Sequence, residues 1–69
     1  MFNLYQSVIA TVDVPSLGLK TGASGVVIDV YSSPYPAYEV EFFDGDGETV
    51  GFISMKPDQV ILENSEVHA

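Results

Sequence analysis

The residues of this chain that could take part in chemistry are carboxylates, and three of them alternate in one short segment. Asp44, Asp46 and Glu48 occupy every second position of the sequence Asp-Gly-Asp-Gly-Glu. Hard cations such as calcium bind several carboxylate oxygens, so this spacing predicts a weak divalent-metal site. The alternative is a solvent-exposed hairpin tip, because Asp-Gly favours the turn between two antiparallel strands. An EF-hand is excluded, since the twelfth position counted from Asp44 is Met55 and not a glutamate.

The other polar residues do not form a catalytic set. The only histidine, His68, lies one residue from the C-terminal end of the sequence, where a general base lacks the fixed geometry that proton transfer requires. Glu39 and Glu41 share one face of a predicted strand about 7 Å apart, but an exposed strand face offers no cleft for paired-carboxylate chemistry. The chain has no cysteine, so a thiolate metal site and a disulfide framework are excluded. We therefore expect a binding protein, with no cofactor and no enzymatic activity.

The composition is strongly acidic. Ten Asp and Glu residues outweigh two lysines, and the formal net charge is −8. Nucleic acids and anionic membrane surfaces require Lys and Arg, so direct binding to either is not expected. A protein partner with a basic surface would be attracted instead. The sequence contains neither a targeting segment nor an apolar run near the about 20 residues of a membrane span, which predicts a cytoplasmic protein.

Turn-forming residues divide the chain into five short apolar segments. A single 3-10 turn is expected over residues 56–59, and Asp44–Gly47 should form a hairpin. Alternation and β-branched residues predict strands over Tyr5–Val12, Gly25–Tyr31, Tyr38–Phe43, Glu48–Met55 and Val60–Leu62. Within the second of these strands, one face would carry Val26, Ile28 and Val30 and the other Val27, Asp29 and Tyr31.

Five short strands protect their edges best when the sheet closes. We therefore predict an all-β protein, a small five-stranded antiparallel SH3-like barrel with a short 3-10 turn before the last strand. The barrel would occupy residues 1–62 as a single domain, followed by a flexible polar C-terminal tail over residues 63–69. Half of an open β-sandwich and an OB-like barrel remain as alternatives. Gly22 and Gly25 should permit positive φ or close approach, and Gly51 should mark a bend or bulge.

Aromatic residues near the acids provide the clearest candidate binding surface. Tyr31, Tyr35 and Phe43 lie at strand ends or on the face predicted to point outward, on the same side as Glu39 and Glu41. Aromatic side chains are enriched at the centres of protein interfaces. An aromatic patch with an acidic rim fits a partner that presents Arg or Lys. The alternative is that a small barrel cannot bury all of its aromatic residues.

Three segments of the chain, Asp13–Val27, Tyr38–Phe42 and Lys56–Val60, carry a resemblance to a known family. They resemble a domain-of-unknown-function family of small, free-standing bacterial proteins that is frequent in cyanobacteria. The resemblance implies an SH3-like barrel, no catalytic residues and a gene next to a second small gene, as in toxin–antitoxin pairs. We expect a small acidic non-catalytic protein-binding module, such as an antitoxin- or immunity-like inhibitor of the adjacent gene's product. The alternatives are a nucleic-acid-mimicking inhibitor of a DNA- or RNA-binding protein and a weak divalent-metal-binding module.

Overall fold

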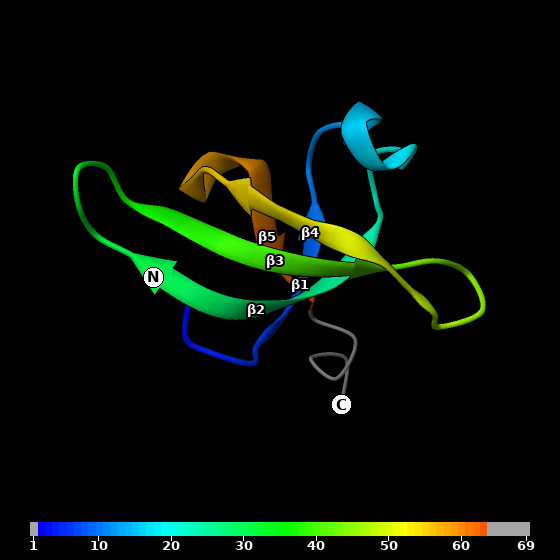
Figure 1. Ribbon diagram of the computed structural model, residues 1–69, viewed down its shortest axis with the longest axis horizontal. Coiled ribbons are helices and arrows are strands. Elements are labelled where there is room, and N and C mark those ends of the chain that lie inside the picture. Colours follow the sequence, from blue (N-terminus) through cyan, green and yellow to red (C-terminus); the bar gives the residue numbers. More distant parts are fainter. Residues whose placement is uncertain (1, 64–69) are drawn as a thin grey trace.

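The computed structural model of the protein describes residues 2–63 and has all-β architecture (Figure 1). All strands lie in one antiparallel sheet in the order β4-β3-β2-β1-β5. The strands are β1 (Ser7–Ala10), β2 (Ser24–Tyr31), β3 (Ala37–Phe43), β4 (Thr49–Met55) and β5 (Val60–Leu62). Two 3-10 turns, η1 (Pro15–Leu17) and η2 (Pro57–Gln59), precede β2 and β5. The prediction of five antiparallel strands with a 3-10 turn before the last one is confirmed.

The sheet is open. Among residues 2–63, β4 pairs with β3 alone and β5 pairs with β1 alone. The β2–β3 loop and the β3–β4 hairpin project from opposite ends of the sheet (Figure 1). After β5, the Glu63 N–H donates to the Ser7 carbonyl at 3.0 Å and extends the contact with β1. The rest of the predicted tail, with His68, lies outside the described residues, and neither described helical turn is long and apolar enough to cross a membrane.

The core lies against one face of the sheet, and β3 supplies its centre. Tyr38, Val40 and Phe42 are buried at every second position of β3, as the alternation predicts. Phe2 packs edge-to-face on Tyr38, with ring centroids 5.0 Å apart. Each of the other four strands, and the loop that contains η1, also contributes buried side chains. These are Val8, Ala10, Val14, Val27, Met55 and Val60.

Strand β2 corrects the predicted alternation. The register with β3 shifts between Val27 and Asp29, so Ile28 is an extra residue that forms a bulge. Before the bulge Val27 is fully buried opposite Val40, and after it Val30 packs against the core. The prediction that Val27 shares a face with Asp29 was therefore wrong, because one inserted residue exchanges the two faces of a strand.

Close approach of the backbone explains two of the glycines. A Cβ at Gly25 would lie 2.6 Å from Val40 Cγ1 and 2.8 Å from the Glu41 carbonyl oxygen, so only glycine lets β2 pass this close to β3. A Cβ at Gly51 would lie 2.8 Å from Leu17 Cδ2, which shows that the β1–β2 loop packs onto β4 there. The predicted close approach at Gly25 is confirmed.

Candidate protein-binding surface

The face of the sheet opposite the core brings three carboxylates together over β2 and β3. Register places Val26, Glu41 and Phe52 side by side in one row across β2, β3 and β4. The neighbouring row contains Asp29, Glu39 and Ser54. We call this surface the acidic face, and its members are Asp29, Tyr31, Glu39, Glu41 and Phe52.

Hydroxyl groups of β4 hold the two glutamates in place. The Ser54 Oγ donates a hydrogen bond to Glu39 Oε1 at 2.8 Å, and the Thr49 Oγ1 donates to Glu41 Oε2 at 2.6 Å. Each carboxylate keeps further acceptor sites, because a carboxylate can accept about four hydrogen bonds. The glutamates are thus ordered before a partner arrives, which lowers the entropic cost of binding a cation.

The phenol of Tyr31 lies close to the carboxylates of Asp29 and Glu39. Its pKa is raised above the ordinary tyrosine value, first because nearby protein removes water from the phenol and then because Asp29 and Glu39 oppose a further negative charge. The bulge at Ile28 has turned Asp29 and Tyr31 outward, so both lie beside Glu39. Tyr31 itself is exposed, and its ring is available to a partner.

The predicted partner-binding residues divide between three places. Tyr31, Glu39 and Glu41 lie together on the acidic face. Tyr35 lies apart from them in the β2–β3 loop. Phe43, at the end of β3, is only half-exposed and lines a hollow of about 430 Å³ that is formed with residues 19–24 and the start of the β3–β4 hairpin.

Phe52 is the member of the acidic face that the sequence analysis missed. Its side chain is 55% exposed, directly opposite Glu41. The signal was present in the alternation of β4, where Gly51, Ile53 and Met55 turn toward the core and leave Phe52 and Ser54 outside.

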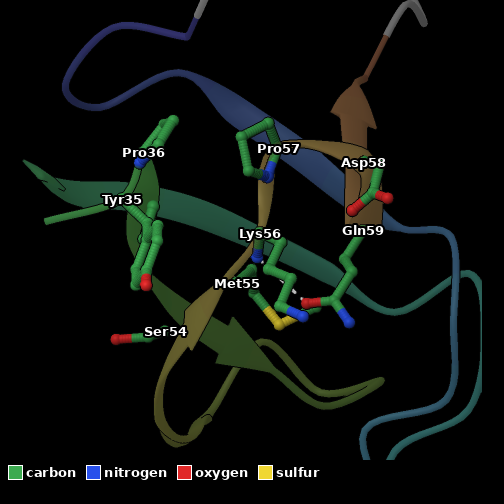
Figure 2. Close-up of a pocket in the computed structure, with 9 residues that line it drawn as sticks. Tyr35, Pro36, Ser54, Met55, Lys56, Pro57, Asp58 and Gln59 are labelled. Carbon is green, nitrogen blue, oxygen red and sulfur yellow. Dashed lines mark hydrogen bonds between the residues drawn. The ribbon is translucent and has the colours of Figure 1, made fainter. Parts of the chain in front are cut away.

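A groove of about 750 Å³ lies beyond the end of β4 (Figure 2). Tyr35 and Pro36 line one side of it, and η2 with Pro57 and Gln59 lines the other. Met55, which is buried, contributes to the groove from between them. Tyr35 is 77% exposed, so this groove presents an aromatic ring that the fold itself does not use.

The predicted metal-binding residues form the tip of the β3–β4 hairpin. The Asp44 carboxylate accepts hydrogen bonds from the backbone N–H groups of Asp46 and Glu48 at 2.9 and 3.0 Å. The Gly47 N–H closes the turn on the Asp44 carbonyl, and Gly47 takes a φ of +81°. Over residues 2–63, no three acidic or histidine side chains are grouped to hold a metal ion. The hairpin itself is confirmed, and Asp44 has a structural role in it.

Comparison with known proteins identifies one family. The model of the family described as "Domain of unknown function (DUF4926)" matches residues 4–62, which include all five strands. No curated protein and no solved structure matches the chain.

Proposed function

The chain belongs to the DUF4926 family of domains of unknown function, and we propose that it is a small acidic protein-binding module without catalytic activity. The observation that carries the proposal is the acidic face, where exposed Phe52 lies beside two hydroxyl-held glutamates. The expected partner is a protein with a basic surface. As the finer fold class we propose an SH3-like barrel that stays open between β4 and β5; the strand order and the position of η2 before β5 support it.

Charge and surface chemistry favour a protein partner. The net charge of −8 attracts basic surfaces and repels nucleic acids. An exposed aromatic ring with a charged rim is typical of the energetic centre of a protein interface, where Arg is enriched on the partner. An arginine side chain could stack on Phe52 while its guanidinium contacts Glu41, which lies directly across from that ring.

Inhibition by binding is the form of this function that we favour. An antitoxin- or immunity-like inhibitor acts by covering a surface of its partner, which requires affinity and no catalytic group. The family that the sequence resembles implies a gene that lies next to a second small gene. The product of that adjacent gene is therefore the first partner to test.

Mimicry of a nucleic acid is supported less well. A mimic needs a line of carboxylates that follows a phosphate backbone. Here Asp29 of β2 and Glu39 of β3 are direct cross-strand neighbours, and Glu41 alone extends the group along β3. The other described acids lie on loops, in η2 or after β5, namely Asp13, Asp44, Asp46, Glu48, Asp58 and Glu63.

Co-purification with matched variants tests the proposal. The tagged protein, purified from its native host at low salt, should retain one stoichiometric partner and release it at high salt. The double variant Glu39→Gln/Glu41→Gln should lose that partner, and Gln preserves an acceptor for the β4 hydroxyls. The control Asp46→Asn/Glu48→Gln removes the same two charges from the hairpin tip and should retain the partner. Equal retention by both variants, or no stoichiometric partner at all, would contradict the proposal.

A further inference from the structure

Strand β4 is an edge strand without charge in a strongly acidic chain. The sequence of Thr49–Met55 is Thr-Val-Gly-Phe-Ile-Ser-Met, with no charged side chain, while the whole chain has a net charge of −8. Every second residue of an edge strand points its N–H and C=O away from the sheet, and soluble proteins usually protect such edges with charges, prolines or bulges. In β4 the bulge at Val50 lies near one end, Lys56 and Pro57 follow the other, and Leu17 of the β1–β2 loop packs on Gly51, so the unprotected stretch runs from Phe52 to Met55.

The outer and inner faces of β4 have different neighbours, and these indicate which side chains a strand paired with β4 would carry. On the outer side, Phe52 and Ser54 adjoin Glu41 and Glu39 of the acidic face. On the inner side, Ile53 is half-buried against the core. The last two residues of β4, Ser54 and Met55, also line the groove beside Tyr35 (Figure 2).

We propose that the open edge of β4 is the docking site for an extended segment of the partner, which pairs with it as a sixth strand. Side chains of an added strand alternate between the two faces of the sheet. Outward residues would be Arg or Lys, which reach Glu39 and Glu41, and inward residues would be apolar and cover Ile53. This inference rests on the proposed function and names the chemistry of the partner's segment: basic and apolar residues in alternation.

A second copy of the chain fits this edge poorly. Antiparallel pairing of β4 with β4 would bring two acidic faces next to each other, and each chain has a net charge of −8. Like charges that face each other across an interface cost free energy. A basic segment removes that repulsion and supplies the backbone hydrogen bonds that the edge lacks.

A titration of the ¹⁵N-labelled protein with synthetic peptides tests the inference. The parent peptide has about ten residues in which Arg alternates with Val, enough to span one strand. Two further peptides have the same side chains but carry N-methyl groups on one or the other alternate set of amides. In an added strand, one set bonds to β4 and the other faces solvent. We expect amide shifts concentrated on β4 and β3, and roughly tenfold or greater weakening with one methylated peptide only.

The alternative outcomes separate the inference from the proposed function. Both methylated peptides could bind as well as the parent and still shift the amide resonances of Glu39 and Glu41. In that case the proposed strand pairing is wrong, but the acidic face remains a binding surface. If a peptide with Glu in place of Arg binds equally, the charge basis of both proposals fails. The inference is also overturned if the parent peptide causes no shifts of the protein's amide resonances. It is likewise overturned if sedimentation shows that the protein is a dimer and hydrogen exchange shows that its β4 amides are protected.

Discussion

Replacing Gly25 by alanine should weaken the fold at the contact between β2 and β3. The new Cβ would lie 2.6 Å from Val40 Cγ1, 2.8 Å from the Glu41 carbonyl oxygen and 3.0 Å from Phe42 Cδ1. Carbon atoms pack favourably at about 3.5–4.0 Å, so the two strands would have to separate. The carbonyl oxygen belongs to the β3 backbone and cannot rotate out of the way as a side chain can.

The size of the effect follows from two opposing terms. Overpacking of a buried site costs about 1–3 kcal/mol, and involvement of the backbone places this site in the upper half of that range. Alanine restricts the unfolded chain more than glycine does, which returns about 0.4–1 kcal/mol. The expected loss in the free energy of unfolding is therefore about 1–2.6 kcal/mol. In a domain of this size that lowers Tm by roughly 4–21 °C.

Urea and thermal unfolding, followed by far-UV circular dichroism, measure this loss, since the chain has no tryptophan. Gly45→Ala is the matched control, because a Cβ at Gly45 meets nothing within 4 Å and its φ is not in the left-handed region. Its stability should stay within about 0.5 kcal/mol of the parent. If Gly25→Ala is as stable as Gly45→Ala, β2 and β3 do not approach as closely as described.

Three further predictions concern the loops and the core. Gly51→Ala should lower the free energy of unfolding by less than about 1 kcal/mol, because the new Cβ would meet the free end of the Leu17 side chain. In a double-mutant cycle with Leu17→Ala the two changes should be coupled, and strict additivity would contradict the contact. The backbone N–H and then the hydroxyl of Thr21 lower the pKa of Asp13, so this stabilisation is present above the usual carboxyl pKa of about 3.9 and is lost as pH falls through the lowered value. The urea midpoint of Asp13→Asn should therefore change less between neutral and acidic pH than that of the parent. Identical pH dependence of the two midpoints would contradict the hydrogen bonds from Thr21 to the Asp13 carboxylate. Phe42→Ala removes a fully buried side chain and should cost about 3–5 kcal/mol, seen as a collapse of NMR dispersion, and a well-dispersed spectrum would show that the core tolerates the cavity.

Alternation and turn chemistry made much of the fold predictable. The inward and outward positions of β3 follow its period of two, and the Asp-Gly pair marks the β3–β4 hairpin. The bulge at Ile28 was not predictable, because an extra residue leaves an apolar strand looking equally apolar. Whether β4 finds a second neighbour depends on the curvature of the whole sheet, which no local pattern records.

The candidate site was predictable where it follows from one strand and not where it needs several. Glu39 and Glu41 were assigned to the outer face because they alternate with buried residues of β3. The alternation of β4 is enough to place Phe52 on the outer face, but its position beside Glu41 depends on the register between two strands. Tyr35 is grouped with Tyr31 in the sequence analysis because both lie at strand ends or on the predicted outward face, but the turn between β2 and β3 carries Tyr35 to the groove at the end of β4.

The position of β1 between β2 and β5 has a consequence for how the protein reaches its folded state. Strands β2, β3 and β4 pair with their neighbours in the chain, so this meander forms from local contacts. By contrast, β1 pairs with β5, joining Val8 to Leu62 at opposite ends of the described chain. Forming that pair requires closure of nearly the whole chain before its few hydrogen bonds are gained. We therefore expect the search for the β1–β5 contact to limit the folding rate, with a meander already formed in the transition state.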